Sequence, residues 1–250
     1  MNKIIDSAAE AVADITSGAS LAVGGFGLCG IPDSLVAALA ARDVTDLEII
    51  SNNCGTDQHG LGILLADKRI HRITASYVGE NSEFARQYLS GELEVELTPQ
   101  GTLAEKLRAG GAGIPAFFTP AGVGTPIAEG GLPWRYASDG SVAVASPPKE
   151  VRTFGGRRYV LEEALTADYA LVHALIGDTE GNLVFDKSAR NFNPLAAAAG
   201  RVCLAEVETL VPAGDLDPAQ VHLPGIFVDR IVHTGPQRKQ IEKLTVAQEH

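Results

Sequence analysis

Short apolar runs alternate with amphipathic segments along the first hundred residues of the chain. Each apolar run is long enough for one buried strand, and the segments between the runs space their apolar positions as one face of a helix does. The predicted strands cover residues 19–23, 47–51, 73–77 and 93–97, and the predicted helices cover residues 8–15, 33–41, 61–67 and 83–89. Regular alternation of strands with helices indicates a mostly parallel sheet with helices on its faces.

The second half of the chain is less regular. Residues 110–113 and 115–133 hold many glycines and prolines, which predicts a long functional loop or a crossing segment. A β-hairpin follows, with a two-residue turn at Gly155 and Gly156. The two strands of the hairpin are predicted over residues 151–154 and 157–161. Further strands are predicted over residues 169–175, 183–185, 202–207 and 227–232, and a helix is predicted over residues 194–199. The prediction for residues 1–250 is a single α/β domain with an open, mostly parallel sheet flanked by helices.

Composition narrows the possible functions. The chain has 250 residues, of which 45% are hydrophobic, so it can bury a substantial core. Its formal net charge of −11 argues against nucleic acid as a partner, because binding to phosphates needs a basic face. Its apolar runs are also too short for a membrane span.

The cysteines and histidines predict neither a disulfide framework nor a metal site. The three cysteines are an odd number without C-x-x-C spacing, and the histidines are scattered without the spacing of metal ligands. The first residues lack the apolar core of a signal peptide. We therefore expect a reducing, cytoplasmic location and no metal. We also expect no tightly bound cofactor.

A glycine-rich loop follows the first predicted strand of the alternating region. The loop, called the glycine loop below, comprises Gly24, Gly25, Phe26, Gly27, Leu28, Cys29 and Gly30. It contains G-x-G-x-x-G between a strand and a helix, which is the context of a dinucleotide site. Such a site also needs an acidic residue at the end of the next strand, where this chain has Ser51, Asn52 and Asn53. We interpret the loop as part of an anion site, in which the glycines let the backbone come close to a ligand and the unpaired N–H groups of the following helix attract the anion. The alternative is a tight turn that binds nothing.

Amide side chains follow the neighbouring predicted strands. Asn52 and Asn53 come after the second of these strands, and Gln100 comes after the fourth. The carboxyl ends of parallel strands share one edge of a sheet, so these residues are predicted to line one cleft with the glycine loop. Neutral amides suit carboxylate or amide ligands. The alternative is that the asparagines only fill turn positions.

Cys29 and Glu80 are the candidate nucleophiles. Cys29 precedes the N-terminus of a predicted helix, which favours a thiolate, but small buried cysteines are common. Glu80 lies in the loop after the third predicted strand. Its carboxylate is suited to attack an activated acyl group, or it is an acid that favours the start of the next helix.

Several strings, taken together and in this order, resemble the A subunit of the family I 3-oxoacid coenzyme A-transferases. The strings are GGFGLCGIP at 24–32, SYVGEN at 76–81, YLSGELEVELTPQGTLAE at 88–105, SPPKE at 146–150, NLVF at 182–185, ARNFNP at 189–194 and PGIFVDR at 224–230. They extend over nearly the whole chain. The resemblance implies the fold of that family and a reaction that moves coenzyme A from an acyl-CoA, such as succinyl-CoA, to a 3-oxo acid such as acetoacetate.

The resemblance also implies how the work is divided between two chains. In the family, a glutamate of the B subunit forms the glutamyl-CoA intermediate, so this chain is expected to carry no catalytic residue of its own, and Glu80 is not expected to be the nucleophile. The glycine loop is expected to bind coenzyme A as a substrate, and Asn52, Asn53 and Gln100 are expected to lie near the acyl substrate. The expected partner is a B subunit, with two copies of each chain.

Three alternatives remain open at this point. Related transferases act on 3-oxoadipate or on short-chain acids such as acetate and butyrate. A less favoured alternative is an NAD-dependent oxidoreductase, which only the G-x-G-x-x-G string supports. A third is a domain without catalysis that senses an acyl-CoA or a sugar phosphate.

Overall fold

One large sheet organises the protein. The computed structural model describes residues 2–79 and 81–237, and its largest sheet has nine strands. Eight of them follow the order β1-β14-β13-β11-β2-β3-β4-β5 with parallel neighbours throughout, and β12 pairs with β11 in the antiparallel direction. The strands are β1 (Ile4–Ile5), β2 (Ser20–Val23), β3 (Leu47–Ile50), β4 (Ile70–Ala75), β5 (Glu94–Leu97), β11 (Ala167–Asp178), β12 (Leu183–Val184), β13 (Gly200–Val211) and β14 (Arg230–His233). The predicted open, mostly parallel sheet is confirmed.

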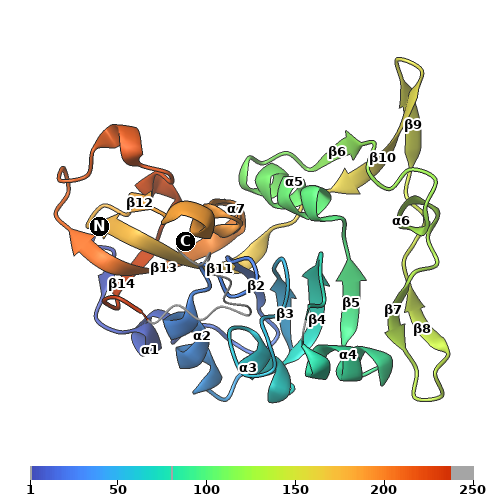
Figure 1. Cartoon of the computed structure of the whole chain (residues 1–250), viewed down its shortest axis with the longest axis horizontal. Coiled ribbons are helices and arrows are strands. Elements are labelled where there is room, and N and C mark those ends of the chain that lie inside the picture. The colour runs from blue at the N-terminus through green and yellow to red at the C-terminus, as the bar shows by residue number, and fades with distance from the viewer. Residues whose placement is uncertain (1, 80, 238–250) are drawn as a thin grey trace, which may run out of the picture.

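Helices cover both faces of this sheet (Figure 1). One face carries α1 (Ala8–Ala11), α2 (Asp33–Ala40), α3 (Gly62–Ala66) and α4 (Ser82–Leu89), and the other carries α5 (Gln100–Gly111) and α7 (Asn193–Ala199). Short 3-10 helices lie at η1 (Lys187–Arg190), η2 (Pro218–Gln220) and η3 (Gly225–Phe227). None of the helices in the described ranges is long and apolar enough to cross a membrane.

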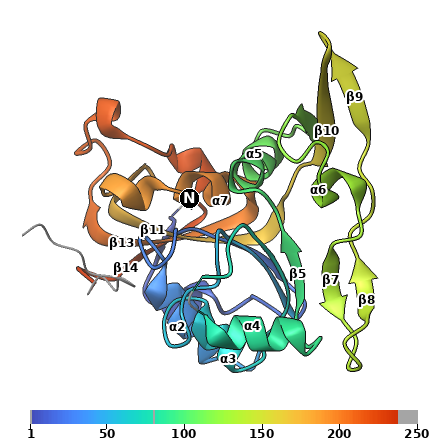
Figure 2. The same ribbon diagram turned by 45° about the vertical axis from the view of Figure 1, so that its right-hand side comes forward.

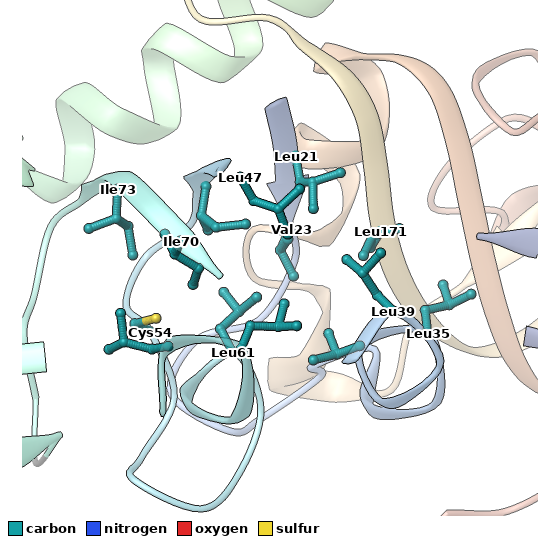
Figure 3. Close-up of a cluster of buried hydrophobic side chains, with 14 of the residues drawn as sticks. Leu21, Val23, Leu35, Leu39, Leu47, Cys54, Leu61, Ile70, Ile73 and Leu171 are labelled. Carbon is teal, nitrogen blue, oxygen red and sulfur yellow. The ribbon is translucent and has the colours of Figure 1, made fainter. Parts of the chain in front are cut away.

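The central strands are apolar on both faces because each face packs against helices. Leu21 and Val23 of β2 lie in one core cluster with side chains of α2 and α3, as Figure 3 shows. Ala22, between them in sequence, lies in the second cluster with Leu103 of α5. A parallel strand buried on both faces has no polar alternation, which explains the continuous apolar runs in the sequence.

The strand order reverses direction between β2 and β11. From β2 the chain continues through β3, β4 and β5 to one edge, whereas β11, β13 and β14 extend toward the other edge. In open α/β sheets, such a switch point beside the carboxyl ends of the strands is where ligands bind. The glycine loop leaves β2 at this point.

A separate group of strands stands beside the large sheet. It contains the three-stranded sheet of β6 (Ala116–Thr119), β10 (Arg157–Glu163) and β9 (Val151–Phe154), the pair of β7 (Pro133–Tyr136) and β8 (Val142–Ala145), and α6 (Pro126–Glu129). Figure 2 shows the β9–β10 hairpin extending away from the large sheet. The predicted hairpin is confirmed. The predicted loop is wrong at 110–111 in α5, at 116–119 in β6, at 126–129 in α6 and at 133 in β7. Strand β6 was missed because it is held by β10 from a later part of the chain.

Buried charges join this group to the large sheet. Glu162 of β10 is 1% exposed, and its carboxylate lies 2.6 Å from Nζ of Lys149 and 3.5 Å from Nζ of Lys106 in α5. Lys106 also lies 3.3 Å from Oε1 of Glu96 in β5. The guanidinium of Arg72 in β4 lies 5.4 Å from the ring centroid of Trp134 in β7.

Candidate functional site

The loops after β2, β3 and β5 converge where the predicted site residues lie. Gln100, the first residue of α5, donates from Nε2 to Oδ1 of Asn52 at 2.7 Å. Asn52 in turn donates from Nδ2 to Oδ1 of Asn53 at 3.1 Å. The backbone N–H of Gly27 donates to the same Asn53 oxygen at 2.8 Å. A continuous chain of hydrogen bonds thus joins Gln100, Asn52 and Asn53 to the glycine loop.

The two asparagines of this hydrogen-bond series are buried. Asn52 is 1% exposed and Asn53 is 5% exposed, and Oδ1 of Asn52 also accepts from Oγ of Ser76 at 2.6 Å. Within the described residues, the amide nitrogen of Asn53 makes no hydrogen bond. The amide oxygens of Asn52 and Asn53 are therefore engaged, and the amide nitrogen of Asn53 is left as a neutral donor.

The backbone donors of the glycine loop are largely used inside the chain. The N–H groups of Gly24 and Gly25 donate to the carbonyl of Leu171 at 3.0 Å and to Oδ1 of Asn191 at 3.2 Å. Phe26 and Cys29 each donate to the carbonyl of the other. Together with the bond from Gly27 to Asn53, five N–H groups of the loop are occupied. These five N–H groups are therefore not free to bind an external anion.

A carboxylate of the protein itself binds the N-terminus of α2, the helix that follows the loop. The N–H of Leu35 donates to Oε2 of Glu206 at 2.9 Å, and Glu206 in β13 is fully buried. A carboxylate at the first turn of a helix satisfies an otherwise unpaired donor and interacts favourably with the helix dipole. The N–H of Leu35 is therefore not available to an external anion.

Glu206 belongs to a buried group of titratable side chains that sequence reasoning missed. His173 of β11 lies between two carboxylates, with Nδ1 at 3.0 Å from Glu206 and Nε2 at 3.1 Å from Glu208. Burial opposes protonation of His173, but its hydrogen bonds and charge interactions with both glutamates outweigh that effect and raise its pKa. Burial, with a smaller contribution from the charge of Glu206, raises the pKa of Asp33 in α2 to about 6.

These groups line a cavity of about 180 Å³ beside the glycine loop, together with Leu28, Cys29, Gly30, Ile31, Gln237 and residues 186–189. A signal for the cluster existed in the sequence. Glu206 and Glu208 stand two residues apart within an otherwise apolar run, so a strand points both to one side. Two carboxylates on one face of a buried strand require partners.

The two candidate nucleophiles have different outcomes. Glu80 lies outside the described residues. Sγ of Cys29 lies 3.4 Å from Oγ of Ser188. The other cysteines, Cys54 and Cys203, are free and fully buried, and burial raises the pKa of both thiols. Within residues 2–79 and 81–237, no group of histidine, cysteine and acidic side chains is arranged to hold a metal ion.

Comparison with known proteins identifies the class. Residues 5–234 match the family described as coenzyme A transferase, and the chain belongs to that family. This confirms the resemblance found in the sequence, and the comparisons give no support to an oxidoreductase.

Individual relatives narrow the class further. The chain is 64% identical over 248 residues to the A subunit of the probable succinyl-CoA:3-ketoacid coenzyme A transferase of Mycobacterium bovis, covering 99% of this chain and 100% of that protein. It is 53% identical over 245 residues to the A subunit of the succinyl-CoA:3-ketoacid coenzyme A transferase of Helicobacter pylori strain J99, covering 98% of each.

A solved structure supports the fold. An acyl-CoA transferase from E. coli O157:H7, crystallised as a thioester complex with CoA, superposes with a TM-score of 0.80 at 23% identity. The match covers 98% of this chain and 50% of that chain, so the chain spans half the length of this structural relative.

Proposed function

We propose that this chain is the A subunit of a heteromeric transferase that moves coenzyme A from succinyl-CoA to a 3-oxo acid such as acetoacetate. Its similarity over the full length to proteins named as that subunit supports the proposal. The observation that carries the proposal is the series of hydrogen bonds that links the side-chain amides of Gln100, Asn52 and Asn53 to the backbone of Gly27. It lies at the switch point of the sheet. The second candidates for the CoA acceptor are 3-oxoadipate and short-chain acids, which related transferases use.

In the proposed reaction, the partner subunit supplies a glutamate carboxylate. That carboxylate attacks the thioester carbonyl, the carbon–sulfur bond breaks, and an acyl-glutamyl anhydride and the CoA thiolate result. The thiolate then attacks the glutamyl carbonyl of the anhydride and releases the first acid, which leaves a glutamyl-CoA thioester. The second acid reverses these steps and takes the CoA.

The amides of this chain have a defined task in that reaction. Each attack converts a carbonyl oxygen into an oxyanion, and preorganised neutral donors stabilise that charge. The amide nitrogen of Asn53, which makes no hydrogen bond to any described residue, is our first candidate donor, and Gln100, which is bonded to Asn52, is the second. A lysine or arginine here would also bind the carboxylates of both acids in the ground state, which gives no gain in kcat.

We propose that acyl-CoA contacts the exposed surface of the glycine loop. Because five N–H groups of the loop are paired within the chain, we expect the loop to contact acyl-CoA through its shape and through Phe26, which is 48% exposed. An exposed aromatic ring on a rigid loop suits the apolar part of the pantetheine arm.

Three further proposals complete the assignment. Residues 1–250 form a single domain that pairs with a B subunit, and the enzyme contains two copies of each chain. The protein acts in the reducing cytoplasm, where its three free cysteines persist as thiols. Coenzyme A is a substrate, and no other cofactor takes part.

The first test measures CoA transfer from succinyl-CoA to acetoacetate by the absorbance of the acetoacetyl-CoA enolate. We expect activity when the chain is purified with its partner and none from the chain alone. Activity of the chain alone would refute the division of labour. The same assay with 3-oxoadipate, acetate and butyrate decides the acceptor, and an NADH fluorescence titration without a saturable change excludes the oxidoreductase.

The second test replaces Asn53 with aspartate in the assembled enzyme. Asn53→Asp keeps the acceptor oxygen for Gly27 and Asn52 but replaces the unbonded donor with a negative charge. We expect kcat to fall by about 100-fold or more, as for the loss of an oxyanion donor. Because the new carboxylate is buried, it should also lower the melting temperature, so kcat is measured at a temperature at which thermal unfolding shows the variant to be fully folded. An unchanged kcat would remove Asn53 from the reacting centre.

A further inference from the structure

The glycine loop is tied to a segment near the other end of the chain. Asn191, which follows η1, accepts from the N–H of Gly25 at 3.2 Å and donates from Nδ2 to the carbonyl of Cys29 at 2.9 Å. One amide therefore bridges the beginning and the end of the loop. Its Nδ2 also donates to the carbonyl of Ser188 at 2.9 Å, which fixes the amide to η1.

Asn193, at the start of α7, makes a second connection. It is fully buried, and its Nδ2 donates at 2.9 Å to the carbonyls of both Gly30 and Ala189. Its Oδ1 accepts from the N–H of His173 in β11 at 3.0 Å. The end of the loop is thus anchored to both α7 and the central sheet.

Two glycines of the loop are explained by this contact. A Cβ at Gly24 would lie 1.9 Å from Oδ1 of Asn193, and one at Gly30 would lie 2.9 Å from its Nδ2. Gly30 also has a φ of +73°. Only glycine allows the loop to approach Asn193 this closely, so these positions serve the connection and need no ligand to explain them.

We propose that Asn191 and Asn193 are positioning residues, which hold the glycine loop in the conformation that binds acyl-CoA. This rests on the proposed function insofar as it assigns the loop to coenzyme A. Neither residue is required to touch the substrate. Their amides replace the ligand as the partner of the loop's backbone, so the loop is ordered before acyl-CoA arrives, which lowers the entropic cost of binding.

Cys29 gives a readout of loop position that is independent of catalysis. Its thiol lies in the loop and is partly exposed, whereas Cys54 and Cys203 are fully buried. Modification of the full chain by iodoacetamide, followed by intact mass and peptide mapping, therefore reports on Cys29. In Asn191→Ala we expect alkylation of Cys29 to be faster by about fivefold or more, because loop opening becomes more frequent when the bridge is lost.

Asn182→Ala is the matched control. Asn182 also uses both ends of its amide, accepting from the N–H of Gly225 and donating to Asp178, but none of these residues belongs to the glycine loop. It should leave alkylation of Cys29 unchanged. If Asn191→Ala fails to fold, Asn191→Asp serves instead, since it keeps the acceptor for Gly25 and loses the donor to Cys29.

The assembled enzyme supplies the second readout. Asn191→Ala should raise KM for succinyl-CoA about threefold or more and leave KM for acetoacetate unchanged, because the competent loop is less populated. Equal alkylation rates in Asn191→Ala and the parent chain would overturn the proposal whatever the kinetics. Faster alkylation with an unchanged KM for succinyl-CoA would overturn the link to acyl-CoA binding. Failure of the proposed function is separate, because the parent enzyme would then transfer no CoA.

Discussion

Removal of the Asp33 charge should stabilise the protein at neutral pH. Asp33 begins α2 and faces Glu206, and burial together with that charge raises its pKa from 3.8 to about 6. The folded protein therefore holds this proton more tightly than the unfolded chain does. The stability that Asp33 contributes in its protonated form is lost as the pH rises from about 4 to about 6. Asp33→Asn avoids that loss.

The size of the stabilisation by Asp33→Asn follows from the pKa shift of Asp33. About two pKa units correspond to about 3 kcal/mol, and solvent at the half-buried side chain reduces this to between about 1 and 2 kcal/mol. Loss of the favourable charge at the N-terminus of the helix subtracts about 0.5 kcal/mol. A net gain of about 1 kcal/mol should raise the melting temperature of a chain of this size by about 2 to 4 °C at pH 7.5.

The assay is thermal unfolding of Asp33→Asn and the parent chain at pH 7.5 and pH 4.5. Since Asp33 is protonated in the folded protein at the lower pH, the advantage of the variant should shrink there to about a third. Asp43→Asn, which changes an exposed acid after the same helix, should alter stability by less than about 0.5 kcal/mol. A lower melting temperature for Asp33→Asn at pH 7.5, or an equal gain at both pH values, would refute the reasoning.

Two further predictions concern stability. Glu162→Gln should lower the free energy of unfolding by about 3 kcal/mol in urea denaturation, because it removes the counter-charge of Lys149 and leaves Lys106 with Glu96 as its remaining buried partner. Glu163→Gln at the exposed neighbouring position should be nearly neutral, and equal losses in the two variants would contradict the assigned role of the buried charges. Gly24→Ala should cost about 2 kcal/mol or more through its clash with Asn193, whereas Gly101→Ala in α5 meets no atom within 4 Å and should cost nothing. A tolerated Gly24→Ala would mean that the loop and Asn193 are less closely packed than the structure places them.

The regular part of the fold was predictable from local pattern. The strands over Ser20–Val23 and Leu47–Ile50 and the hairpin at Gly155 and Gly156 appear where apolar periodicity and turn residues place them. Helix α5 was not predicted, because its sequence QGTLAEKLRAGG is framed by glycines. Leu103 and Leu107, four residues apart on one helix face, were its only strong signal.

The convergence of the site was predictable only in outline. The rule that parallel strands share a carboxyl edge places Asn52, Asn53 and Gln100 near the glycine loop. It does not say which atoms pair. The structure shows that these amides bond to one another and to Gly27, a detail that depends on the relative heights of three loops.

By itself, the sequence determined the strands and helices of the regular alternating region, the parallel α/β class and the family, because these depend on local preferences, burial and long matching strings. Tertiary structure alone decided that the backbone donors of the loop pair with Asn53 and Asn191 and that Glu206 satisfies the first turn of α2. Those contacts join residues up to 171 positions apart in the chain. They follow from placing β11 beside β2 and β13 beside β11, and strand order is a global property that no local pattern encodes.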